Sequence, residues 1–181
     1  MRLFVALDLP DLLRGRLAAL SHHAIPGARW VPADNYHVTL RFIGEAAAWQ
    51  AEEIDHALAA LRAPGFALTL AGIGSFGAKG GRGATLYAGV ERSAPLDHLR
   101  AKVETALQRI GLEPERRRFW PHVTLARLDN APEAKLAEWV QAHSLFRCPP
   151  VRIAHFTLFS SLLNKDHPVY TPEVEYALGA A

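Results

Sequence analysis

The stretch His37-Val38-Thr39-Leu40 is the most informative feature of this 181-residue chain for its fold and site, because the same four residues recur as His122-Val123-Thr124-Leu125. An arginine follows each copy closely, Arg41 after the first and Arg127 after the second. Successive side chains of a β-strand point to opposite faces, so the His and Thr of each copy share one face and the Val and Leu share the other. Two such strands side by side would bring two imidazoles and two hydroxyls together.

A third match, His155-Phe156-Thr157-Leu158, means that the four-residue pattern alone does not identify the site. His155 lacks the Asn-Tyr or Pro that precedes the other two histidines, and no arginine follows it closely. We therefore expect His155 to be structural or to lie on a sheet surface.

The composition is that of an ordinary globular protein, with 50% hydrophobic and 21% charged residues. A net charge of +2 is too small for bulk attraction to nucleic acid, so any basic patch must be local. The single cysteine, Cys148, excludes an internal disulfide and a cysteine-based zinc site. No apolar run approaches the roughly 20 residues of a membrane helix, and residues 1–8 do not resemble a signal peptide. We expect a cytoplasmic monomer without membrane contact.

Hydrophobic periodicity predicts an α+β fold in a single domain over residues 1–181. Each repeated tetrapeptide is followed by a helix and two strands, which indicates a weak internal duplication and two lobes with antiparallel or mixed sheets. A Gly-rich segment over 77–83 predicts a hairpin loop. The expected strands are 2–8, 36–43, 66–76, 84–91, 122–128, 151–160 and 169–178, and the expected helices are 11–22, 47–62, 95–110 and 132–143.

Paired histidines suit a reaction in which one proton is removed while another is donated. Imidazole has an ordinary pKa near 6.5, so at neutral pH one ring can be neutral while its neighbour is protonated. Each proton transfer contributes about 10²–10⁴-fold in rate. Hydroxyls from Thr39 and Thr124 would stabilise negative charge on phosphate oxygens. Because the sequence shows no metal-binding motif such as H-E-x-x-H, we expect neither a metal nor a cofactor.

The chain resembles the two-histidine (2H) phosphoesterases, specifically the bacterial and archaeal RNA 2′,3′-cyclic phosphodiesterases, also known as 2′-5′ RNA ligases. The resemblance extends over nearly the whole chain. It is carried by residues 2–7, 35–44, 121–127, 156–159 and 170–172, which include both tetrapeptides. It implies a bilobal fold in which two pseudo-symmetric lobes face a central cleft, with helices on the outside.

The resemblance also implies an activity, namely hydrolysis of a terminal 2′,3′-cyclic phosphate to a 2′-phosphate, with His37 as the proton donor and His122 as the proton acceptor. The partner would be RNA with such an end, for example a tRNA fragment, or a cyclic nucleotide. Reversible 2′-5′ ligation would use the same groups with their roles exchanged. Three alternatives stay open: a non-catalytic module that binds nucleotides or RNA ends, a metal-dependent phosphodiesterase, and a small-molecule cyclic phosphodiesterase.

Further residues are candidates for substrate binding. The family has an arginine beside the phosphate at the position of Arg127, although strict alternation from His122 would turn this side chain to the opposite face unless a bulge intervenes. Arg41 lies at an even spacing from His37 and is expected on the histidine face, either in contact with the RNA backbone or as a solvated charge. The run 116–118 is either a basic lip or a charged turn. Phe42 could stack on a base or pack in the core, and core packing is the expectation.

Overall fold

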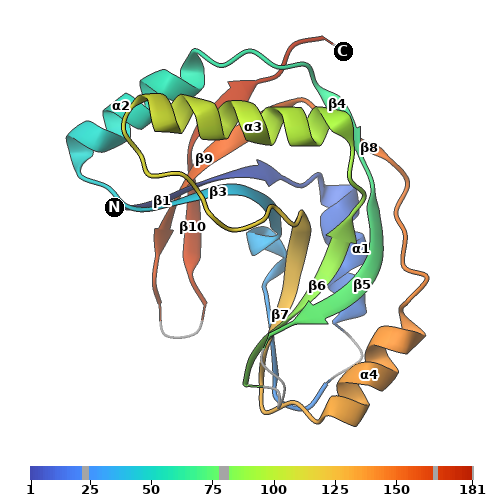
Figure 1. The fold of residues 1–181 in the computed structure, drawn as a ribbon. Coiled ribbons are helices and arrows are strands. Elements are labelled where there is room, and N and C mark those ends of the chain that lie inside the picture. Colours follow the sequence, from blue (N-terminus) through green and yellow to red (C-terminus); the bar gives the residue numbers. More distant parts are fainter. Residues whose placement is uncertain (22–24, 78–81, 165–166, 181) are drawn as a thin grey trace.

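The computed structural model describes residues 1–21, 25–77, 82–164 and 167–180. Antiparallel strands dominate this part of the chain and form a sheet with the order β10-β9-β1-β3-β7-β6-β5, to which β2 adds by pairing with β7 (Figure 1). The strands of this sheet are β1 (Arg2–Asp8), β2 (Ala28–Trp30), β3 (His37–Glu45), β5 (Leu70–Phe76), β6 (Arg82–Val90), β7 (His122–Asp129), β9 (His155–Leu162) and β10 (Val169–Ala177). A separate pair joins β4 (Phe66–Leu68) to β8 (Val151–Ile153).

Four α-helices accompany the sheet in the described residues: α1 (Asp11–Leu20), α2 (Ala48–Ala59), α3 (Ala94–Arg109) and α4 (Glu133–Ala142). In Figure 1, α2 and α3 lie side by side along the half of the sheet that contains β1, β9 and β10, while α1 and α4 accompany the half that contains β5, β6 and β7. The α+β class predicted from the sequence is confirmed.

Helix boundaries follow local signals in the sequence. The hydroxyl of Ser93 accepts a hydrogen bond from the Leu96 N–H at the start of α3, and a proline occupies the first turn. The buried residues of α3 recur at helical spacing, as Leu96, Leu99, Val103 and Leu107. Helix α1 buries Leu13, Leu17 and Leu20, whereas Leu12 is exposed.

The two halves of the internal duplication begin at other strands than the sequence had indicated. The sheet order reads β9-β1-β3 on one side of the centre and β5-β6-β7 on the other, so β3 corresponds to β7, β1 to β6 and β9 to β5. Each half therefore begins one strand and one helix before its tetrapeptide, and β10 is an additional edge strand. Strands β4 and β8 occupy equivalent places in the two halves and pair with each other, which is also consistent with this pseudo-twofold relation.

Two of the expected strands are interrupted, and both breaks occur at equivalent points. The expected strand 66–76 divides into β4 and β5 at Thr69, and 151–160 divides into β8 and β9 at Ala154. In each case the chain leaves the small sheet and enters the large one. Strand β2 and the short 3₁₀ helix Ala33–Asn35 were not predicted. The predicted loop at 77–83 falls mainly on residues outside the described part of the chain.

Most of the buried apolar residues form one core beneath the large sheet. Val38, Leu40, Val123 and Leu125, the apolar members of both tetrapeptides, belong to this core and are at most 3% exposed. Phe4, Ala6 and Phe159 form a separate small cluster against which Tyr170 packs. This small cluster contacts the ring of His37, so it lies on the opposite, histidine-bearing face of the sheet.

Candidate active site

The two tetrapeptides meet at the centre of the sheet. Val38 pairs with Val123 in antiparallel register, and extending this register by one residue sets His37 opposite Thr124 and Thr39 opposite His122. With a rise of about 3.3 Å per residue and a strand spacing of about 4.8 Å, the Cα atoms of the two histidines are separated by roughly 8 Å. The positive charge of His122 also contributes to lowering the pKa of His37. The two imidazoles therefore share one site.

A main-chain carbonyl two residues upstream fixes each imidazole. The Asn35 carbonyl oxygen lies 2.8 Å from Nδ1 of His37, and the Trp120 carbonyl oxygen lies 2.6 Å from Nδ1 of His122. Since a carbonyl can only accept, Nδ1 of each ring carries the proton. In a neutral ring Nε2 is then a free acceptor, and the Thr39 hydroxyl, 3.1 Å from Nε2 of His37, donates to it. Both rings therefore hold Nε2 ready to exchange a proton.

Aromatic rings surround both histidines. The ring centroid of His37 lies 5.0 Å from that of Phe4, 6.4 Å from that of Phe159 and 5.2 Å from that of Tyr170. The centroid of His122 lies 5.1 Å from that of Phe76 and 5.6 Å from that of Tyr87. These rings exclude water from the imidazoles, which disfavours the charged form.

Burial has the largest effect on both pKa values. It lowers the pKa of His37 to about 4, against a rise caused by the Asn35 carbonyl. Among the charged side chains, Asp8 raises the pKa of His37, whereas Arg14 and His122 lower it. Burial also lowers the pKa of His122, the Trp120 carbonyl raises it, and Arg127 lowers it further. In the ligand-free protein both rings are therefore neutral at pH 7.

A register shift occurs at the same point of both motif strands. Val5 pairs with Arg41 and the next residue of β1, Ala6, pairs with Thr39, so Leu40 is an extra residue. Likewise Leu86 pairs with Ala126 and Tyr87 with Thr124, so Leu125 is the extra residue in β7. Each β-bulge inverts the alternation beyond it.

The bulge in β7 turns Arg127 to the histidine face, as the sequence had allowed. Its side chain is exposed, and its guanidinium donates to the Thr85 hydroxyl at 3.0 Å. Burial lowers the pKa of His122 and raises that of Tyr170, and the charge of Arg127 acts to lower both pKa values. His122 and Tyr170 come from opposite halves of the sheet. Arg127 therefore lies where it can contact an anion bound between the two histidines.

The bulge in β3 has the reverse effect on Arg41, so the expectation that it faces the same way as His37 is wrong. Arg41 is only 9% exposed and is on the core side. Its Nε lies 2.9 Å from a carboxylate oxygen of Glu104, and its guanidinium also donates to the carbonyls of Phe42 and Glu113. A buried, paired guanidinium does not contact RNA directly.

Phe42, expected in the core, occupies the histidine face instead, and its side chain is 59% exposed. Strict alternation gave the wrong face for the same reason as for Arg41. Phe42 pairs with Phe4 in β1, as Arg127 pairs with Thr85 in β6. At these two equivalent positions the halves of the site therefore differ, with the aromatic ring of Phe42 in one half and the cation of Arg127 in the other.

The remaining candidates lie around this centre. Thr39 and Thr124 are half-buried on the histidine face, and residues 116–118 and Trp120 are exposed in the segment that leads into β7. His155 begins β9, and β1 lies between this strand and β3, which carries His37. Its role as a structural or surface residue stays a prediction. Tyr170, which belongs to the stretch 170–172 that carries the family resemblance, contacts His37 from β10.

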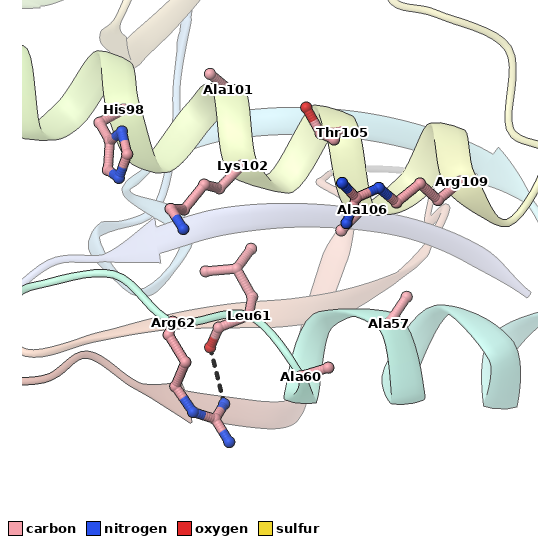
Figure 2. A pocket seen from close by; sticks show the side chains of 10 residues that line it. All are labelled: Ala57, Ala60, Leu61, Arg62, His98, Ala101, Lys102, Thr105, Ala106 and Arg109. Atoms are coloured by element: carbon pink, nitrogen blue, oxygen red, sulfur yellow. Dashed lines mark hydrogen bonds between the residues drawn. The ribbon is translucent and has the colours of Figure 1, made fainter.

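A groove of about 490 Å³ lies elsewhere, between α2 and α3 (Figure 2). In Figure 2, Lys102 points toward Leu61 and Arg62, which follow the carboxyl end of α2, and Arg62 donates to the Ala59 and Leu61 carbonyls at 2.8 and 2.9 Å. The positive charges of Arg62 and Lys102 complement the negative end of the helix dipole, and we assign no ligand to this groove. The basic side chains that line it are Arg62, His98, Lys102 and Arg109.

Neither a metal cluster nor a membrane span is found where the chain is described. Residues 1–21, 25–77, 82–164 and 167–180 contain no group of three His, Cys, Asp or Glu side chains that could hold a metal ion. Over the same ranges, every helix is too short or too polar to cross a bilayer.

A continuous antiparallel sheet presents two histidines and two threonines at its centre, an arrangement suited to acid–base chemistry by paired imidazoles. The sequence model of the 2′-5′ RNA ligase superfamily matches residues 9–165, and the chain belongs to this family.

Individual relatives align with this chain over most of their length. The RNA 2′,3′-cyclic phosphodiesterase of Aeropyrum pernix is 35% identical, with 86% of this chain and 91% of the relative aligned. The Escherichia coli protein of the same name is 31% identical, with 98% and 96% aligned. The crystal structure of E. coli LigT in apo form superposes with a TM-score of 0.80 at 29% identity, covering 98% of this chain and 97% of LigT. LigT complexed with 3′-AMP gives a TM-score of 0.76 at 31% identity, with the same coverage.

Proposed function

We propose that this protein hydrolyses RNA 2′,3′-cyclic phosphate ends to 2′-phosphomonoesters by paired-histidine acid–base catalysis without a metal. The observation that carries the proposal is the pairing of Val38 with Val123, which sets two imidazoles, each with Nδ1 clamped by a carbonyl, on one face. The names of the Aeropyrum pernix and E. coli relatives support the same substrate class.

In the proposed reaction, Nε2 of neutral His122 removes a proton from water, and the water oxygen attacks phosphorus. The bond from phosphorus to the 3′ oxygen breaks, and His37 protonates that oxygen. The products are a 2′-phosphate and a 3′-hydroxyl. Thr39, Thr124 and Arg127 would hold the non-bridging oxygens, where negative charge increases in the transition state.

Neighbouring charges favour this division of roles. Arg127 acts on His122 and disfavours its protonated form, which suits a base. Asp8, which pairs with His37 across β1 and β3, favours the protonated form of His37, which suits an acid. Burial outweighs Asp8 in the ligand-free protein. The bound anionic phosphate would supply the negative charge that raises the pKa of His37 enough for it to be protonated.

The exposed ring of Phe42 offers a platform for the terminal base. Stacking of a base on an aromatic ring is worth about 1–3 kcal/mol and tolerates any base. With Phe42 on one side and Arg127 on the other, the terminal nucleoside would lie toward β3 and the phosphate between the histidines. The proposal also includes that the protein acts in the cytoplasm and that tRNA fragments are among its substrates.

The test is product analysis on an oligoribonucleotide with a 2′,3′-cyclic end, in excess chelator. We expect a 2′-phosphate, and we expect His37→Ala and His122→Ala to lose turnover by at least about 10²-fold while remaining folded. His155→Ala is the matched control, because it alters the third copy of the pattern and should retain activity. Turnover that survives in both His37→Ala and His122→Ala would exclude the mechanism, and a 3′-phosphate product would reverse the choice of leaving group.

A further inference from the structure

The approach to His122 depends on a long irregular segment. Helix α3 ends at Arg109 and β7 begins at His122, and residues 110–121 between them contain neither helix nor strand. This segment supplies the Trp120 carbonyl that clamps Nδ1 of His122. Main-chain hydrogen bonds anchor its two ends, where the Leu112 N–H donates to the Leu107 carbonyl at 3.1 Å and the Val90 N–H donates to the Pro121 carbonyl at 3.2 Å. Side chains contact the residues between these ends.

A buried ion pair ties the first part of this segment to the fold. Glu104 of α3 is 7% exposed, and its carboxylate accepts a hydrogen bond from the Glu115 N–H at 2.9 Å. The other carboxylate oxygen lies 2.9 Å from Nε of Arg41, whose guanidinium donates to the Glu113 carbonyl. Burial acts to raise the pKa of Glu104, but hydrogen bonds from Gln108 and Glu115, with the charges of Arg41 and Arg100, lower it overall. Glu104 is therefore a carboxylate at neutral pH.

The same carboxylate reaches the second part of the segment through Arg100. The Arg100 guanidinium lies 3.6 Å from Glu104 and is positioned over the Phe119 ring, with 5.7 Å from its central carbon to the ring centroid. Phe119 is the residue directly before Trp120. A continuous series of contacts thus connects Glu104 with the carbonyl that holds His122.

The pair is not required by the fold itself. At the position of β7 that corresponds to Arg41, the buried residue is Ala126. The approach to His37 is instead held by the 3₁₀ helix Ala33–Asn35, to which Arg14 donates at 2.9 Å. Burying a charge pair is costly, and apolar replacement often leaves stability unchanged or higher. The charges therefore serve the approach to His122 rather than the packing of the sheet.

We propose that Glu104 and Arg41 are positioning residues that hold residues 110–121 so that the Trp120 carbonyl keeps His122 protonated on Nδ1. The consequence for turnover rests on the proposed function, in which His122 is the base. The consequence for the ring tautomer does not, because it can be observed without substrate.

The experiment compares wild type with Glu104→Gln, and with the double variant Arg41→Met/Glu104→Met, which removes both members of the buried ion pair. The ¹⁵N shifts of the His122 ring report its tautomer, and steady-state kinetics on the cyclic-ended oligoribonucleotide separate kcat from KM. We expect both variants to show mixed tautomers at His122, and kcat to fall roughly ten- to hundredfold because the base is misaligned. The tautomer of His37 should not change.

Leu58→Ala, a buried change in α2, is the control for destabilisation alone, and it should retain the His122 tautomer and the wild-type kcat. If either folded variant keeps both the Nδ1–H tautomer of His122 and the kcat of wild type, the positioning role is overturned. If His122→Ala retains turnover, the proposed function fails, and the ring tautomer still decides the role of Glu104.

Discussion

The buried imidazole of His37 makes the stability of this protein dependent on pH in a way that can be calculated. Its pKa is lowered to about 4, chiefly by burial among aromatic rings, whereas in the unfolded chain it should be near 6.5. The unfolded state therefore binds a proton first as the pH falls. The contribution of His37 to stability is fully present above about pH 6.5 and is lost as the pH falls toward 4.

The size of this effect follows from the two pKa values. Between pH 7 and pH 4.5 the linkage relation gives a loss of about 2.5 kcal/mol in the free energy of unfolding from His37 alone. This is a large share of the 5–15 kcal/mol typical of a folded domain. Other groups also titrate over this range, so the contribution of His37 must be isolated as a difference between two proteins.

The assay is urea unfolding of wild type and His37→Gln at pH 7.0 and pH 4.5. The glutamine has no titration in this range, so its loss of stability between the two pH values should be smaller than that of wild type by about 2.5 kcal/mol. His98→Gln changes an exposed histidine and should lose as much as wild type. Equal losses in wild type and His37→Gln would refute the account of His37 as a desolvated imidazole.

Three further predictions concern substrate binding, and each is checked by steady-state kinetics on a cyclic-ended oligoribonucleotide. Arg127→Met removes a charged donor to the phosphate and should lower kcat/KM by roughly ten- to a hundredfold, with Arg127→Lys partly active; a value within threefold of wild type would exclude the contact. Phe42→Ala should raise KM by about five- to a hundredfold through lost stacking, whereas Phe42→Trp should not; equal KM values for both would remove the platform. Thr39→Val and Thr124→Val should each lower kcat by about tenfold or more, since each loses one hydroxyl donor, and unchanged rates would mean that the hydroxyls serve only the fold.

The sequence was a good guide to elements and a poorer guide to faces. Alternation correctly set Val38 and Val123 in the core and the histidines on the other side, because both positions precede the bulges. Beyond the bulge the same rule failed for Arg41 and Phe42, and only the register of β1 against β3 shows why. An extra residue in a strand has no signature of its own in residue types, since Leu40 is an ordinary strand residue.

Which residues share the site could also be predicted in part from the sequence. The repeat predicted that two histidines and two threonines act together, a hypothesis that the central pairing of β3 with β7 supports. The carbonyl clamps could not be predicted, because the residues that supply them are Asn35 and Trp120, and a main-chain carbonyl leaves no trace in the sequence. The strand at which each half of the duplication begins was not predicted, because β1 and β6 correspond only through their places in the sheet.

By itself, the sequence determined which chemical groups this protein presents in duplicate and which apolar residues bury the strands that carry them. Those properties are local, since they depend on residue type and on the two-residue period of a strand. Tertiary structure alone decided which face each side chain occupies beyond the bulges, and it placed the exposed ring of Phe42 in one half of the site and the guanidinium of Arg127 at the equivalent position of the other half. Such features depend on how distant strands pair, and a shift of one residue in that pairing exchanges the faces.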